Sequence, residues 1–134
     1  MAQFSDITYR QGIRSKGFQV TVPTTGAQQT LSLSGLAKSF EGILLSSTTS
    51  AAPATPIDPM QLKITLVINN DVAIDDDLAY HYALSGTGGF TGGFPFFIPI
   101  PRRLTGQDTI LLRVTNSSGA SQILNVNVWY RNEI

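Results

Sequence analysis

The chain has no cysteine, which excludes disulfide bonds and zinc sites built on thiolate ligands. It has a single histidine, His81, so a zinc site with two or more imidazole ligands is excluded as well. Only 13% of its 134 residues are charged, against about 25% in a typical soluble domain. Ser, Thr, Asn, Gln and Gly must therefore supply most of the polar surface.

Neither sign of charge predominates, because nine Lys and Arg residues balance nine Asp and Glu residues. A net charge of zero gives no global field that would steer the protein to nucleic acid or to an anionic membrane. No apolar run approaches the ~18 residues of a membrane span, and the first residues lack the pattern of a secretory signal. We therefore expect a protein made and used without Sec-type export, with neither nucleic acid nor membrane as its partner.

Apolar residues are plentiful enough for one domain. They make up 42% of the chain, which suffices to bury a core without metal or disulfide bonds. We expect a single domain over residues 17–134. Residues 1–16 mix apolar and basic side chains and have two interpretations: a first strand with a solvated loop, which is favoured, or an arm that lies on a neighbouring subunit.

Alternation of apolar and polar residues predicts strands in the first half of the chain. Residues 17–34 predict a hairpin around a Pro-Thr-Thr-Gly turn, and residues 40–45 predict a third strand with a bulge at Gly42. Residues 46–59 are rich in Ser, Thr and Pro and predict a long exposed loop.

The second half of the chain repeats this pattern. Residues 61–74 predict a hairpin around an Asn-Asn-Asp turn, and residues 109–115 and 122–131 predict a long C-terminal hairpin. Residues 75–86 fit a short helix or a strand, and we expect the helix or an irregular turn. About eight or nine short strands with at most one short helix predict an all-β fold, an antiparallel β-sandwich that is jelly-roll-like.

Few residues could carry catalysis. A Ser-His-Asp triad around His81 would need a serine and an aspartate as partners, and the sequence does not indicate them. The neighbours of His81 in the chain are Tyr80 and Tyr82. Glu41 and Glu133 are the only glutamates, and nothing pairs them as a glycosidase requires. We therefore expect no enzyme activity, no catalytic residue and no cofactor.

Four aspartates form the only acidic cluster: Asp71, Asp75, Asp76 and Asp77. Closely spaced oxygen ligands can hold Ca²⁺, but the spacing of an EF-hand is absent. Asp and Asn at strand ends commonly form turns and caps instead. The turn interpretation is favoured, so no metal site is predicted.

The least ordinary stretch is residues 92–104, Gly-Gly-Phe-Pro-Phe-Phe-Ile-Pro-Ile-Pro-Arg-Arg-Leu. It is too apolar for a plain loop, and its prolines remove backbone donors, which excludes a helix or a central strand. We expect an extended, edge-like or polyproline-like segment covered by this domain or by another chain. The interface candidates are its apolar residues and two arginines near the N-terminus: Phe94, Phe96, Phe97, Ile98, Ile100, Arg10 and Arg14.

Residues 60–134 contain a distinctive order of motifs. Asp-Asp-Asp after a turn is followed by a glycine loop, Phe-Pro-Phe-Phe-Ile-Pro-Ile-Pro-Arg-Arg-Leu, Asp-Thr-Ile-Leu-Leu-Arg-Val-Thr-Asn-Ser-Ser-Gly and a closing strand that ends Val-Trp-Tyr-Arg. This order resembles small bacteriophage virion proteins, single jelly-roll or related β-sandwich modules that act as auxiliary, cement or decoration subunits on a capsid. The resemblance implies a non-enzymatic virion protein, assembled in the host cytoplasm, that trimerises or bridges capsomers of the major capsid protein.

Two functions from different classes stay open. Low charge, the apolar proline segment and the lack of a catalytic constellation favour a virion structural protein, a homo-oligomer for which we expect a trimer. The alternative is a glycan-binding β-sandwich, in which Trp129, Tyr80 or Tyr82 would stack on sugar rings. A single tryptophan supports it less, because aromatic side chains are more often buried by packing.

Overall fold

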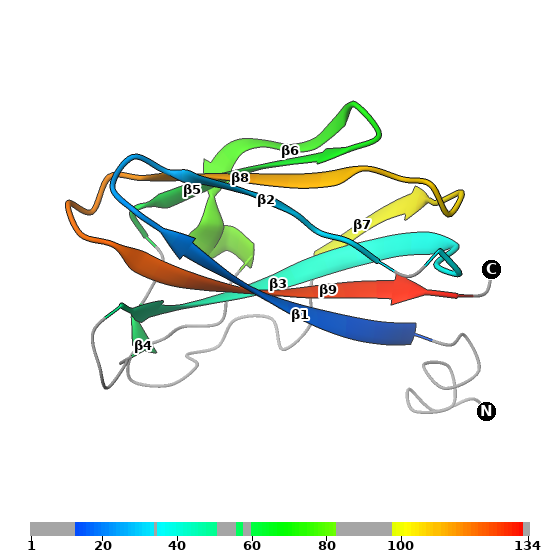
Figure 1. Ribbon diagram of the computed structural model, residues 1–134, viewed down its shortest axis with the longest axis horizontal. Coiled ribbons are helices and arrows are strands. Elements are labelled where there is room, and N and C mark those ends of the chain that lie inside the picture. Colours follow the sequence, from blue (N-terminus) through cyan, green and yellow to red (C-terminus); the bar gives the residue numbers. More distant parts are fainter. Residues whose placement is uncertain (1–12, 34, 51–55, 58–59, 83–97, 133–134) are drawn as a thin grey trace.

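The computed structural model describes residues 13–33, 35–50, 56–57, 60–82 and 98–132. Their strands form two antiparallel sheets that pack face to face, which confirms the predicted all-β sandwich (Figure 1). Within these ranges helix is limited to η1, a 3₁₀ turn over Ala79–Tyr82. No helix in the described ranges is long and apolar enough to cross a membrane.

Sheet A contains five strands and sheet B four. Sheet A has the order β1 (Ile13–Val22), β9 (Gln122–Arg131), β3 (Ser39–Thr49), with β4 (Pro56–Ile57) and β7 (Ile98–Arg103) both paired to β3. Sheet B has the order β2 (Ala27–Thr30), β8 (Ile110–Asn116), β5 (Leu62–Ile68), β6 (Asp71–Leu78). Leaving out the two-residue β4, the orders 1-9-3-7 and 2-8-5-6 are those of a jelly roll.

Strand β1 begins within the stretch that was set apart as residues 1–16. Its first four residues, 13–16, pair with the end of β9 in an unbroken register. These residues are therefore part of the sandwich, while residues 1–12 lie outside the described ranges.

Two of the predicted hairpins are wrong in their pairing. Strand β1 pairs with β9 and β2 with β8, so the turn at residues 23–26 carries the chain from sheet A to sheet B. Strands β8 and β9 also lie in different sheets, and their connection is a second such corner. The physical reason is that period-two alternation identifies the buried face of a strand but not the strand that lies beside it.

The predicted Asn-Asn hairpin is confirmed. Strands β5 and β6 pair around Asn69 and Asn70, whose positive φ angles of 51° and 68° make the tight turn that such hairpins require. The predicted helix at residues 75–86 starts later than expected, because β6 continues through a bulge. There Asp76 has a φ of 47°, and its N–H donates to Thr65 Oγ1 at 3.1 Å.

The predicted loop at residues 46–59 is wrong at its start, because β3 continues to Thr49. Ser47 is only 1% exposed and points into the sandwich. Its hydroxyl lies 3.2 Å from both Gln122 Oε1 and the Ile123 carbonyl oxygen. A buried hydroxyl with such partners costs little free energy, so pairing with β9 overrides the loop-like composition.

The core fills the space between the two sheets. The bulge predicted at Gly42 is confirmed by the register shift between Phe40 and Gly42 on β3. The extra residue allows Phe40 and Ile43, at an odd spacing, both to point inward, and both are 0% exposed. Other fully buried side chains come from both sheets: Leu31, Leu45, Leu62, Ile64, Leu66, Leu112 and Leu124.

Asn116 links the two corners where the chain changes sheet. Its Nδ2 donates to the carbonyl oxygens of Val22 at 3.1 Å and Ala120 at 2.8 Å. Its Oδ1 accepts a hydrogen bond from the Ser118 N–H at 2.9 Å.

Replacing Asn116 with alanine should lower the free energy of unfolding by about 1–3 kcal/mol, because carbonyl groups of both corners lose their donor. Denaturation in urea measures the change. Ser117→Ala is the matched control, since this neighbour contributes one side-chain bond, to the Gln61 carbonyl at 3.1 Å. Equal losses in the two variants would show that Asn116 has no special role in the corners.

Candidate functional site

Some of the predicted interface residues lie outside the described ranges: Phe94, Phe96, Phe97 and Arg10. Ile98 and Ile100 belong to β7, and Ile100 is partly buried against the core of its own chain. Arg14 is exposed on β1. Among the described strands β7 pairs only with β3, so residues 98–103 have the extended, edge-like form that was expected.

The histidine lies beside a carboxylate at the end of β6. Asp77 Oδ1 is 2.9 Å from His81 Nδ1, and Asp77 Oδ2 accepts a hydrogen bond from the Tyr82 hydroxyl at 3.0 Å. The bond with His81 lowers the pKa of Asp77 below its ordinary value of 3.8. Burial, together with the bond to Asp77, raises the pKa of Tyr82 to about 12. Asp77 thus caps η1.

This pair does not form a triad with the described residues. The His81 side chain is 53% exposed, and within the described ranges its hydrogen bonding is to Asp77 alone. No Ser or Thr hydroxyl of those ranges is bonded to its other ring nitrogen. The local role of the pair is to hold the 3₁₀ turn against the end of β6.

The aspartates of β6 do not converge. In the part of the chain that the structure describes, no group of three or more His, Asp or Glu side chains could hold a metal ion. Asp71 pairs with Arg102 at 3.0 Å, whereas Asp75 and Asp76 are exposed. A calcium site is therefore not assembled from these residues.

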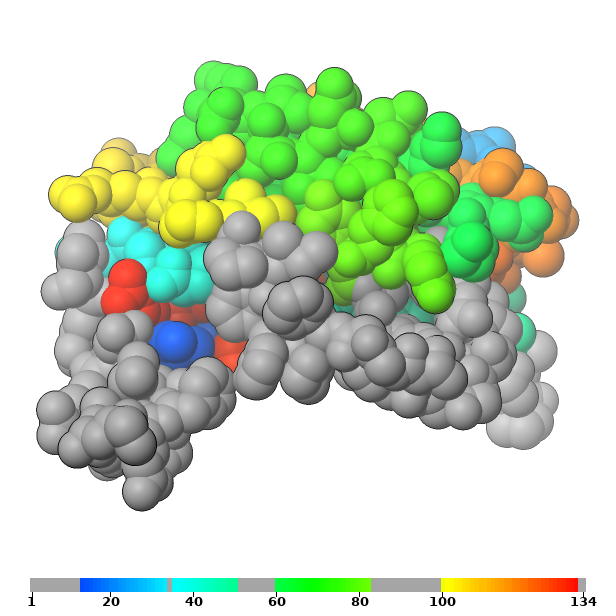
Figure 2. Space-filling model, turned by 180° about the vertical axis from the view of Figure 1, so that it is seen from behind, coloured from blue at the N-terminus to red at the C-terminus, as the bar shows by residue number. Residues whose placement is uncertain are grey.

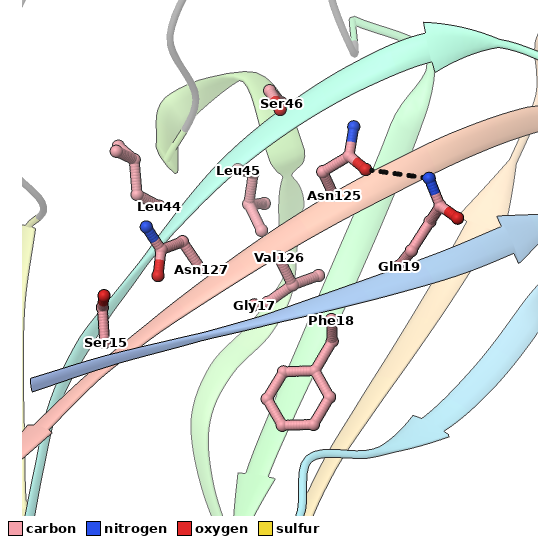
Figure 3. Close-up of a pocket in the computed structure, with 10 residues that line it drawn as sticks. All are labelled: Ser15, Gly17, Phe18, Gln19, Leu44, Leu45, Ser46, Asn125, Val126 and Asn127. Carbon is pink, nitrogen blue, oxygen red and sulfur yellow. Dashed lines mark hydrogen bonds between the residues drawn. The ribbon is translucent and has the colours of Figure 1, made fainter.

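A hollow of about 640 Å³ lies on the outer face of sheet A, where the sequence indicated no site. We call it the amide hollow. Figure 3 shows β1, β3 and β9 crossing beneath it, with Gln19 Nε2 donating to Asn125 Oδ1 at 3.4 Å. Its lining residues are Ser15, Gly17, Phe18, Gln19, Leu44, Leu45, Ser46, Asn125, Val126 and Asn127.

Glycine creates much of this space. The register places Gly17 of β1 and Leu44 of β3 on either side of Asn127. A Cβ atom at Gly17 would meet no atom within 4 Å, so the missing side chain leaves the space beside Asn127 open. Each amide nearby offers both a donor and an acceptor, which suits ligands rich in hydroxyl or amide groups.

The aromatic residues proposed for sugar stacking do not share one element. Trp129 lies on β9, two residues beyond Asn127 and on the same outer face, and is half-buried. Tyr80 and Tyr82 lie on η1, which follows a strand of sheet B. Tyr80 is 41% exposed, but Tyr82 packs against the core. Only Trp129 is therefore placed to extend the amide hollow.

A second hollow, of about 200 Å³, lies at one end of sheet A. We call it the basic hollow. Its lining residues are Lys38, Ser39, Glu41, Pro101, Arg102, Arg103 and Arg131. The register places Arg131 and Arg103 on either side of Ser39 in one row across β9, β3 and β7. Figure 2 shows these strands side by side at the surface, β7 in yellow, the start of β3 in cyan and the end of β9 in red.

The basic hollow has a surplus of positive charge. Arg131 Nε pairs with Glu41 Oε1 at 2.7 Å, and the carboxylate of Asp71 partners Arg102. Lys38 and Arg103 have no ion-pair partner within the described ranges. These charges were not recognised in the sequence because they are far apart along the chain and cancel in the net charge.

No protein-family model matches this chain, and no curated protein matches it. The jelly-roll frame and the two hollows on the outer face of sheet A are therefore the features from which a function can be inferred.

Proposed function

We propose that the protein is a non-enzymatic structural virion protein, an auxiliary, cement or decoration subunit that binds a phage capsid. The observation that supports this proposal is the strand order 1-9-3-7 over 2-8-5-6, the jelly roll, which is common among viral capsid proteins. Because one fold hosts many functions, the surface has to support the proposal as well. The outer face of sheet A combines apolar Leu44 with amide and basic groups, a mixture typical of protein interfaces.

The test is whether the protein belongs to particles. Virus particles from the source of the sequence are banded in a density gradient, stripped of loosely held subunits and incubated with the purified chain. The protein should band with the native particles, and the purified chain should rebind to the stripped ones until its sites are saturated. Recovery only in particle-free fractions, without rebinding, would refute the proposal.

The purified chain should be a homotrimer of about 43 kDa, three copies of the 14.4 kDa chain. With 42% hydrophobic and only 13% charged residues, one copy has few charged groups with which to solvate its surface. Contiguous apolar patches above a few hundred Å² usually mark interfaces. Light scattering at micromolar concentration and physiological salt measures the mass, and a value near that of one chain would contradict the expectation.

A glycan-binding module is a second candidate, and the amide hollow favours it. Gln19, Asn125 and Asn127 line one hollow, and Trp129 follows on the same face. Amides can bond neighbouring sugar hydroxyls, and an indole can stack on the apolar side of a ring. A glycan array is the test: binding that Asn127→Ala removes would support this candidate, and an array without binding would contradict it.

A further inference from the structure

Two cations and two anions that have no ion pair within the described ranges lie on different sheets of this neutral chain. The basic hollow on sheet A holds Lys38 and Arg103, which have no ion-pair partner in the described ranges. Strand β6 at the edge of sheet B holds Asp75 and Asp76, both exposed and likewise without an ion pair there. Two unpaired cations therefore face away from the domain at one place and two unpaired anions at another.

These groups are too far apart to neutralise each other within one chain. Asp71, at the start of β6, pairs with Arg102, which lines the basic hollow. Asp76 lies five residues further along β6, which is roughly 16 Å at about 3.3 Å per residue. That exceeds the Debye length of about 8 Å at physiological salt, so the exposed charges scarcely interact.

We propose that the basic hollow receives Asp75 and Asp76 of β6 from a second copy of this chain. The bulge gives β6 one residue more than β5 between the pairs Ile64–Asp77 and Leu66–Ile74. Asp75 and Asp76 are thus displaced from the regular ladder. An arginine can bind a carboxylate with two parallel hydrogen bonds, so Arg103 suits this ligand in geometry as well as in charge.

The proposed contact rests on the proposed function, because it requires the oligomer proposed there. It adds to that function by naming the two surfaces that meet. It joins two different patches, so it is heterologous, and heterologous contacts repeated around a three-fold axis close a trimer. A second copy is the occupant that the charges favour, because its exposed Asp75 and Asp76 carry the sign opposite to that of Lys38 and Arg103. The same pairing fixes which edge of one subunit meets which end of the next.

The first measurement is the salt dependence of assembly in the full-length protein. Sedimentation equilibrium is carried out at about 0.1 M and 1 M NaCl, between which the Debye length falls from about 10 to 3 Å. The dissociation constant of the oligomer should rise at least about tenfold. A dissociation constant that is the same at both salt concentrations would overturn the proposal.

The second measurement is a charge swap. Lys38→Glu with Arg103→Glu should weaken assembly at least about a hundredfold, and Asp75→Lys with Asp76→Lys should do the same, because each creates like-charge contacts. The variant with all four changes should have an oligomer dissociation constant within about tenfold of that of the parent. Lys16→Glu is the control for a reversed surface charge, since Lys16 is exposed on β1 and belongs neither to the basic hollow nor to β6, and it should assemble normally.

The outcomes separate this proposal from the virion function. Unchanged assembly in the basic-hollow variant, or no recovery in the variant with all four changes, overturns the proposed contact. Particle rebinding is scored separately in the gradient assay. The trimer could depend on salt and respond to the charge swap as expected, yet never bind particles. That result would support the contact and refute the virion function.

Discussion

Phe40→Ala should lower the free energy of unfolding by about 3–5 kcal/mol, the range for a large aromatic side chain removed from a core. Phe40 is the largest of the fully buried side chains and is 0% exposed. The loss includes both the transfer of the ring to water and the cavity left between the sheets, which the paired strands around β3 can only partly collapse.

Phe18→Ala is the matched control for this prediction. Phe18 is only partly buried, and Lys16 Nζ lies 5.3 Å from its ring centroid at the edge of the sandwich. The same substitution should therefore cost distinctly less than at Phe40, because less apolar area leaves contact with the protein. Both variants are unfolded in urea at one protein concentration, since association changes the apparent stability. Equal losses would show that the bulge does not place Phe40 in the centre of the core.

The faces of the strands could be predicted from the sequence, because side-chain direction follows from alternation alone. Alternation within residues 61–74 puts Leu62, Ile64 and Leu66 on one face of their strand, and all are 0% exposed. In the same way alternation within residues 122–131 puts Asn125 and Trp129 opposite the buried face of the last strand, and they lie on the outer side of sheet A. Local geometry decides these positions without any knowledge of the neighbouring strands.

The pairing of strands could not be predicted in this way. A short turn rich in Gly, Ser and Asn can return the chain along one sheet or carry it to the other. Asn69 and Asn70 make a true hairpin, whereas residues 23–26 and 117–121 form corners. The difference depends on contacts formed after both sheets assemble, such as the bond from Asn116 to the Val22 carbonyl.

The hollows were missed for the same reason. The amide hollow combines residues 15–19, 44–46 and 125–127, which only the pairing of β1 and β3 with β9 brings together. The basic hollow combines Lys38, Arg103 and Arg131, whose charges are balanced elsewhere in the composition. Each site is a product of topology, so knowledge of the β1–β9, β3–β9 and β3–β7 pairs would have been enough to find both.

Gly17→Tyr should abolish binding at the outer face of sheet A while leaving the fold intact. A Cβ atom at Gly17 has open space around it, and tyrosine is favourable in strands, so the substitution adds no clash. Glycine in a strand costs roughly 0.5–1 kcal/mol in conformational entropy, so the variant should melt at the parent temperature or slightly higher. The ring would occupy the space between Asn127 and the neighbouring residues of β1, where a ligand would otherwise reach the amides.

The affinity of the Gly17→Tyr protein for stripped particles should fall at least about tenfold. The added ring would fill the amide hollow and keep a bound partner from reaching the groups that line it. Binding to any glycan recognised by the parent should fall similarly. Gln28→Tyr, at an exposed position of β2 on the other sheet, controls for an added aromatic ring and should bind as the parent does. Because the proposed subunit contact uses the basic hollow, the oligomer mass should be unchanged. If Gly17→Tyr binds particles and glycans like the parent, the amide hollow is not the recognition surface, and the docking face must lie elsewhere on the domain.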